Sequence, residues 1–217
     1  MAACTSTILA VLSVLQRPPV ATRWMERRQL MTASFALAGL PAARTASATD
    51  FAELSDAQYA YHLSYPADWK EAPKPVKTHM HESLLSSTSG KGLKLGITVD
   101  PVKIDSLEAF GTLDQVTERV LAVEAARDGV QNVTLRANAA QLGDTAAEIP
   151  SYYTIEWATV SSRGKKLFSC KYCITSKKLY VLQVQASLDA FDSDDTVRSQ
   201  VKSIVESFSV GSKANVV

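Results

Sequence analysis

The chain has 217 residues, of which 46% are apolar and 21% charged, and its 23 basic and 22 acidic residues give a formal net charge of +1. This composition is typical of a globular protein with one main domain and excludes an overall basic surface for nucleic acid. Three cysteines are too few for a disulfide scaffold.

Residues 1–48 differ in composition from the rest of the chain. They hold five arginines, no lysine, a single acid and many Ser, Thr and Ala. Arg27 and Arg28 precede an apolar run over 30–40, which is shorter than the roughly 20 residues of a membrane-spanning helix. Small residues suited to a signal peptidase follow at Ala46 and Ala48. The segment predicts a targeting peptide that is removed; the alternative is a disordered tail.

The leader resembles a twin-arginine export signal preceded by a chloroplast transit peptide, the bipartite address of a thylakoid-lumen protein. Removing it takes away five of the 23 basic and one of the 22 acidic residues, which leaves 18 and 21 and a net charge near −3. One domain over 49–217 is the simplest division of what remains.

The first half of this domain predicts strands. Alternating apolar residues over 59–65 and 93–99 have the period of half-buried strands, and Pro66 ends the first one. Residues 79–86 predict a third strand, paired with 93–99 through a Ser-Gly-Lys-Gly turn at 89–92.

From Thr112 the apolar period becomes that of a helix, which Thr112 caps and Gly129 stops. A weak strand follows over 133–139, with a turn at Gly143 and Asp144. Stronger strands over 151–160, 167–174 and 179–186 are joined by short turns, so they are expected to be antiparallel neighbours.

One face of these three strands is expected to form the core, with these residues on it: Tyr153, Ile155, Trp157, Phe168, Cys170, Tyr172, Ile174, Tyr180, Leu182 and Val184. A final helix is predicted to start near Ser193 and to bury an apolar stripe that ends at Phe208. The fold class is therefore α+β, with helices packed on an antiparallel sheet.

Several short motifs, in their order, resemble the PsbP family. They are Tyr-Pro-Ala-Asp-Trp at 65–69, Phe-Gly-Thr at 110–112, Lys-Leu-Tyr at 178–180 and Ser-Phe at 207–208. The family comprises the extrinsic subunit of photosystem II, part of the oxygen-evolving complex, and its PsbP-domain relatives in the thylakoid lumen. The resemblance covers roughly residues 51–210.

The resemblance implies an α/β/α sandwich around an antiparallel sheet of about six strands. It also implies a protein that is not an enzyme, that is peripheral to the membrane and monomeric when free, and that docks to photosystem II, photosystem I or the NDH complex. Calcium or manganese is a cofactor that the family suggests. No long lysine-rich arm follows the predicted cleavage point, which favours a PsbP-domain relative acting in assembly, repair or stability.

Basic residues gather where the three strong strands are joined. Six of them occur between Trp157 and Leu188 without one acid: Arg163, Lys165, Lys166, Lys171, Lys177 and Lys178. They predict a docking surface for an acidic partner, and the alternative is a set of solvated turn lysines. Because the two turns flank one eight-residue strand, they are expected to lie roughly 25 Å apart.

The CxxC formed by Cys170 and Cys173 lies in the middle of a predicted strand. Three strand steps put the two side chains on opposite faces about 10 Å apart, which is too far for a disulfide. Cys170 is expected to point inward and Cys173 to be available; a redox or metal role is the alternative.

His79 and His81 would share one strand face about 7 Å apart, a workable spacing for a metal. No third ligand is identifiable, so a surface pair is the alternative. No glycine-rich phosphate loop, HExxH motif or nucleophile setting occurs in the sequence. The rival to a docking protein is a carrier of a metal or small ligand, which would use these histidines or the corner formed by Tyr65 and Trp69.

Overall fold

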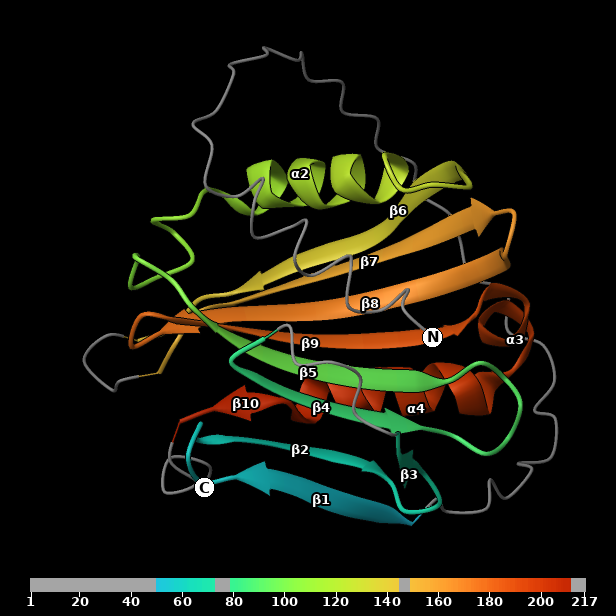
Figure 1. Cartoon of the computed structure of the whole chain (residues 1–217), viewed down its shortest axis with the longest axis horizontal. Coiled ribbons are helices and arrows are strands. Elements are labelled where there is room, and N and C mark those ends of the chain that lie inside the picture. Colours follow the sequence, from blue (N-terminus) through green and yellow to red (C-terminus); the bar gives the residue numbers. More distant parts are fainter. Residues whose placement is uncertain (1–49, 73–78, 145–148, 212–217) are drawn as a thin grey trace, which may run out of the picture.

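The computed structural model describes residues 50–72, 79–144 and 149–211. Strands predominate along this part of the chain (Figure 1). The elements in chain order are β1 (Phe51–Asp56), β2 (Tyr61–Pro66), β3 (Lys70–Glu71), β4 (His81–Ser86), β5 (Lys94–Pro101), α2 (Leu113–Ala125), β6 (Val130–Gln141), β7 (Tyr152–Ser161), β8 (Gly164–Thr175), β9 (Lys178–Ser187), α3 (Leu188–Ser193), α4 (Asp195–Ser207) and β10 (Ser209–Val210).

The described strands form two sheets. Seven strands make one antiparallel sheet in the order β3-β4-β5-β9-β8-β7-β6, so the sheet has one strand more than the six expected. The strands β1, β2 and β10 make a separate antiparallel sheet. The predicted pairing of 79–86 with 93–99 is confirmed as β4 with β5, although β4 begins only at His81.

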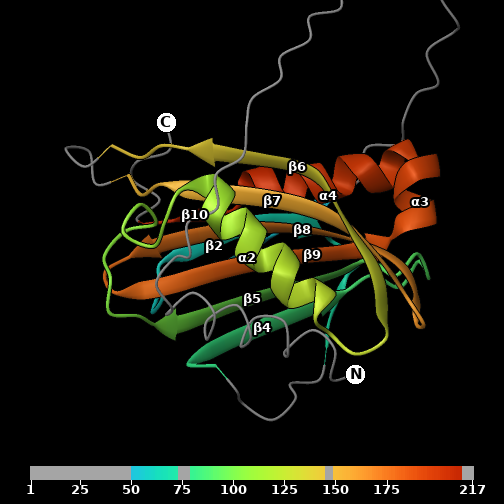
Figure 2. The same ribbon diagram turned by 90° about the horizontal axis from the view of Figure 1, so that it is seen from above.

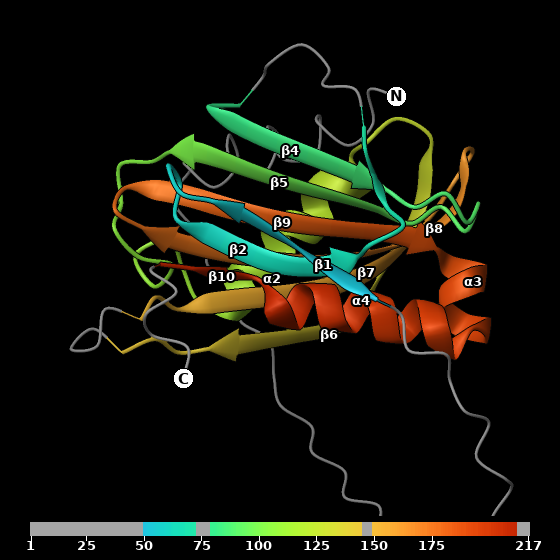
Figure 3. The ribbon, with the colours of Figure 1, turned by 90° about the horizontal axis from the view of Figure 1, so that it is seen from below.

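Both faces of the seven-stranded sheet are covered, which confirms the α+β sandwich. The helix α2 lies on one face (Figure 2), while α4 and the three-stranded sheet lie on the other (Figure 3). A separate apolar core fills each side: one contains Trp157 and Val120, and the other contains Leu182 and Ile204. Burying both faces of a sheet in this way removes far more apolar surface from water than a one-sided sheet would.

The core face predicted for β9 is wrong. Tyr153, Ile155, Trp157, Phe168, Cys170, Tyr172 and Ile174 do share the α2 side, together with Leu179 and Val181. Tyr180, Leu182 and Val184 lie on the opposite side. The register explains the difference, because Tyr172 pairs with Val181 and Cys170 with Gln183, which puts the odd-numbered β9 residues on the α2 face.

The predicted strand over 59–65 is only partly confirmed. The strand β2 begins at Tyr61 and buries Tyr61 and Leu63, whereas Tyr59 lies in the turn before it. Ala60 closes this turn with a left-handed φ of 51°. The strand pairs with β1, which was not predicted, and both belong to the small sheet. The strand expected over 133–139 is also longer, since β6 has 12 residues.

The helices begin where their capping residues stand. Thr112 accepts a hydrogen bond from the Gln115 amide while the Gln115 side chain accepts one from the Thr112 amide, a complete capping box for α2. The Asp194 side chain accepts a hydrogen bond from the Thr196 amide and so caps α4, which starts two residues after Ser193. The short helix α3 that precedes it was not predicted. Lys91, which donates to Asp194 over 2.6 Å, lowers the pKa of that carboxyl to about 2.

Within the described ranges, no helix is long and apolar enough to cross a membrane.

Candidate functional site

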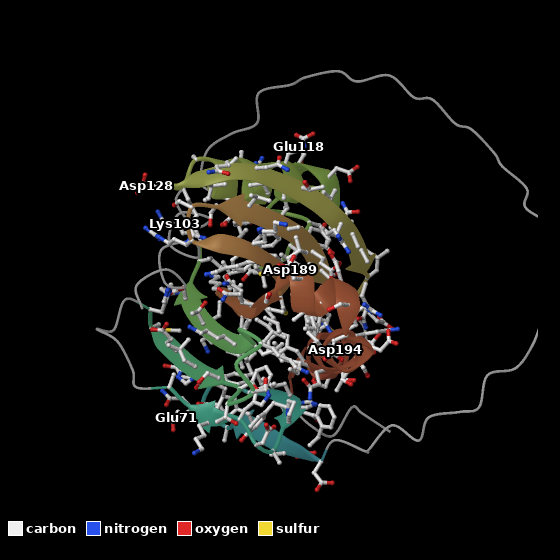
Figure 4. All side chains as sticks on the ribbon, turned by 90° about the vertical axis from the view of Figure 1, so that its right-hand side faces the viewer. Glu71, Lys103, Glu118, Asp128, Asp189 and Asp194 are labelled. Carbon is white, nitrogen blue, oxygen red and sulfur yellow. The ribbon has the colours of Figure 1, made fainter. Side chains whose placement is uncertain are left out.

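The β7–β8 turn carries Arg163, Lys165 and Lys166, and it is tied to the loop that follows α2. The Ser162 amide donates to the Gly129 carbonyl over 2.9 Å, which brings Arg127 and the buried Glu124 to the same end of the sheet. Figure 4 looks onto this end and labels Asp128 and Asp189 on it.

The basic side chains at this end are held differently. Arg163 is exposed, and Lys165 lies 4.0 Å from the exposed Asp189, a distance at which an ion pair in water contributes little. Arg127 instead donates to both oxygens of Glu124, whose side chain is 1% exposed. The guanidinium of Arg127 is therefore committed to an internal carboxylate, while Arg163 and Lys165 face solvent.

The β8–β9 turn carries Lys177 and Lys178 at the opposite end of the same strand. Because β8 has 12 residues rather than eight, the two turns are about 36 Å apart and not 25 Å. Ser176 and Lys177 have φ values of 51° and 55°, a left-handed pair that favours Asn and Gly. The Lys178 ammonium lies 5.9 Å from the centre of the Tyr59 ring. The predicted docking residues thus form two separate basic sites.

Lys171 does not belong to either site, which corrects its place in the predicted basic surface. Its side chain is buried beneath α4, where the ammonium donates to the carbonyls of Val205 and Phe208 over 3.2 and 2.9 Å and lies 4.6 Å from the Tyr152 ring centre. These carbonyls end a helix, where the macrodipole stabilises a cation. Burial nevertheless lowers the pKa of Lys171 below its usual value.

The two cysteines of β8 are not joined by a disulfide and lie on opposite faces of the sheet, as the strand spacing predicts. Cys170 points into the α2 core, but Cys173 is fully buried in the other core, so the expectation that it is available is wrong. Burial raises the pKa of the Cys173 thiol to about 12. A thiol that stays protonated to such a pH is a poor nucleophile and metal ligand at neutral pH.

His79 and His81 have different partners. His79 Nδ1 lies 2.6 Å from Asp100 Oδ2, and His79 itself is buried. His81 Nε2 is 2.8 Å from the Tyr61 hydroxyl and 3.6 Å from Asp56, so it links β4 to the small sheet. Within the described residues, no three His, Cys, Asp or Glu side chains gather as a metal site would require.

A cleft of about 1200 Å³ lies at the sheet end that carries the β8–β9 turn, and no motif in the sequence predicts it. Its walls come from the ends of many elements and include Tyr59, Tyr152, Lys178, Tyr180, Glu108 and Leu142. Hydrogen bonds from Ser151 and Ser106 lower the pKa of Glu108, and burial raises that of Tyr152 to about 12. The Tyr65 and Trp69 corner is not part of the cleft wall, and Trp69 is buried in the core.

The targeting residues Arg27, Arg28, Ala46 and Ala48 lie outside the described residues, so the leader stays a prediction.

Comparison with known proteins identifies the family. The profile of the PsbP family matches residues 49–210, which is most of the chain and nearly all of the described part. This protein belongs to the PsbP family. The chain is also similar to the chloroplastic PsbP domain-containing protein 2 of Arabidopsis thaliana, with 26% identity over 157 residues that cover 71% of this chain and 64% of that protein. The chain therefore spans somewhat less than two thirds of that relative.

Solved structures show the same fold. The cyanobacterial PsbP of Synechocystis sp. PCC 6803 superposes with a TM-score of 0.60 at 18% identity, over 79% of this chain and 98% of that chain. The Ran-binding protein Mog1p of Saccharomyces cerevisiae gives a TM-score of 0.51 at 8% identity, over 77% and 98%. At such identities the likeness extends to the fold and not to a shared partner.

Proposed function

We propose that this protein is a non-catalytic accessory protein of the thylakoid lumen, which docks to a photosynthetic membrane complex and aids its assembly, repair or stability. The observation that carries the proposal is the PsbP-family match over residues 49–210. The chloroplastic name of the Arabidopsis relative and the bipartite character of residues 1–48 support the compartment. The partner is a lumenal subunit of photosystem II, photosystem I or the NDH complex.

The β7–β8 turn is the proposed contact. Arg163 and Lys165 face solvent on a domain whose net charge after loss of the leader is near −3, so this turn presents positive charge on an otherwise acidic protein. Such an asymmetry orients a protein toward an acidic partner during association, and salt screens it. Lys166, at the same turn, adds a third cation.

The test is retention of the purified domain (residues 49–217) on thylakoid membranes opened to expose their lumenal side. Replacing Arg163, Lys165 and Lys166 with Glu is expected to release the domain at 50 mM salt. The matched control is Lys202→Glu on α4, where the lysine side chain is 75% exposed. If the triple variant is retained as well as the control, the turn is not the contact. If the unaltered domain is not retained at all, and cross-linking in intact chloroplasts finds no photosynthetic subunit, the proposed function is wrong.

The cleft favours a second function, the carriage of a small ligand. Its volume exceeds the 300–1,000 Å³ of ordinary ligand pockets. Tyrosines and charged side chains of both signs line its wall. Native mass spectrometry of the protein purified from chloroplasts would show a bound mass if the protein is a carrier. A protein that migrates with a large complex and carries no added mass would leave docking as its function.

A further inference from the structure

Among the residues that the structure describes, no strand pairs with the outer edge of β6. This strand ends the seven-stranded sheet, and β7 is its one described neighbour (Figures 2 and 3). At the other end of the sheet the last described strand, β3, has two residues, so the two edges differ greatly in length. Among the described residues, no backbone hydrogen bond from a loop or another element reaches residues 137–141. Half of the backbone N–H and C=O groups along this stretch therefore point outward, as on any edge strand.

Residues 137–141 of β6 carry neither a charged side chain nor a proline to hinder pairing with another strand. Proteins commonly protect a long edge with charged side chains or proline, but β6 has no proline and Arg136 is its one charged residue. Arg136 is already paired with Asp192 of α3 over 2.8 Å. Two register shifts, before Asn132 and before Ala137, interrupt the strand and leave residues 137–141 as a regular segment.

Exposed apolar side chains lie beside this segment. Among the described residues, five large hydrophobic side chains are exposed, and three of them lie on β6 or in the connection to β7: Leu135 (41%), Leu142 (75%) and Ile149 (41%). Leu142 and Ile149 also form part of the wall of the large cleft. Exposed apolar groups that gather around a free strand edge are typical of a site where another polypeptide binds.

The edge is held rigidly from both faces of the sheet. The Asn138 side chain donates to Thr117 of α2 over 3.2 Å, while Arg136 ties the strand to α3 on the other side. A rigid edge loses little conformational entropy when a second strand pairs with it.

We propose that residues 137–141 of β6 accept an extended, uncharged and apolar segment of a partner polypeptide as an additional strand, with Leu142 and Ile149 packing against its side chains. The inference rests on the proposed function and assigns the chemistry of one contact with the membrane complex. The neutrality of the edge sets the chemistry of the partner segment, since a charged segment would lose its hydration there without gaining an opposite charge.

A second copy of this chain fits the edge less well. Antiparallel self-pairing centred on Ala139 would place Arg136 opposite Leu142 in both halves of the interface. Each half would then bury the partly exposed Arg136–Asp192 ion pair beside an apolar side chain, and removing an ion pair from water is costly.

The experiment combines two exposed replacements, Ala139→Lys and Leu142→Lys, with Ala122→Lys as the control on the exposed surface of α2. Retention of the domain on opened thylakoid membranes is measured at 50 mM and at 1 M salt, because 1 M salt shortens the screening length to about 3 Å and suppresses the contribution of the basic turn. We expect the edge variant to bind at least tenfold more weakly than the control at 1 M salt. Circular dichroism melts establish that both variants are folded. Equal retention of the edge variant and the control would overturn the inference and leave the proposed function intact.

A photo-cross-linking residue placed at Ala139 and, separately, at Gln141 then identifies the partner segment. If a strand is added, the two positions cross-link to residues two apart on one uncharged segment, because paired strands advance together. A cross-link to a charged segment, or to a second copy of this chain, would overturn the inference. If the unaltered domain is not retained on the membranes and cross-linking in intact chloroplasts finds no photosynthetic subunit, the proposed function is refuted, and the inferred partner with it.

Discussion

Replacing Cys173 with Ala should make the protein more resistant to alkaline pH. The thiol is fully buried, and burial raises its pKa from 9.0 to about 12. Since the folded pKa is the higher one, the folded state keeps a proton that the unfolded state releases. The contribution of this group to stability is complete below pH 9 and is lost as the pH rises toward 12.

The size of the effect follows from the interval between the two pKa values. One pH unit corresponds to about 1.4 kcal/mol, so at pH 10.5 the thiol should lower the free energy of unfolding by about 2 kcal/mol relative to pH 7.5. The Ala variant lacks this loss. At pH 7.5 it should be less stable than the unaltered protein by about 1 to 2 kcal/mol, because removing the sulfur leaves a small cavity.

Urea unfolding followed by circular dichroism at pH 7.5 and 10.5 measures both effects. Val184→Ala is the matched control, since Val184 lies in the same core and does not titrate. Titration of buried tyrosines such as Tyr152 also lowers the free energy of unfolding at high pH, but it does so in the unaltered protein and in both variants. If Cys173→Ala loses as much stability between the two pH values as the control, the thiol titrates like an exposed one and the reasoning is wrong.

Three further predictions concern single buried contacts. Lys171→Met should lower the free energy of unfolding by about 1 to 3 kcal/mol, because the carbonyls at the end of α4 lose their donor; urea unfolding at pH 7 that shows equal or greater stability would contradict it. Gly143→Ala should destabilise the protein by about 1 to 3 kcal/mol, because the new Cβ would clash with the Ile149 carbonyl oxygen, and an unchanged melting temperature would exclude this clash. Glu124→Ala should lower the free energy of unfolding by about 3 to 5 kcal/mol in urea unfolding, because the partly buried Arg127 loses the buried carboxylate that it contacts, and the double variant with Arg127→Ala should recover part of that loss.

Local patterns in the sequence account for most of the elements. The alternation and short turns of 151–186 predict the β7–β8–β9 hairpins, and Thr112 predicts the start of α2. The face of β9 was assigned wrongly because a strand buried on both sides has no polar face: Leu179 to Val184 are all buried, so alternation carries no information there. Register then depends on the pairing with β8, which the strand's own sequence does not specify.

The site was less predictable because its contacts join distant parts of the chain. Lys171 looks like a surface lysine in the sequence, because the carbonyls that its ammonium contacts, Val205 and Phe208, come 34 and 37 residues later. His79 and His81 looked like a pair by spacing, but their partners Asp100 and Asp56 come from different sheets. The cleft has no sequence signature, since it lies where the ends of separate elements meet. The uneven protection of the sheet edges could have been inferred from the low charge of 130–141.

The two basic turns lie at the two ends of β8, an interior strand of the seven-stranded sheet, and this has a mechanical consequence. The strand β8 is hydrogen-bonded on both sides and buried along most of its length, so it cannot shorten or bend without breaking the core. When this protein binds a partner through Arg163, β8 therefore fixes both the distance to Lys177, about 36 Å, and its direction. Two subunits gripped at opposite ends would be kept at that separation by the protein between them.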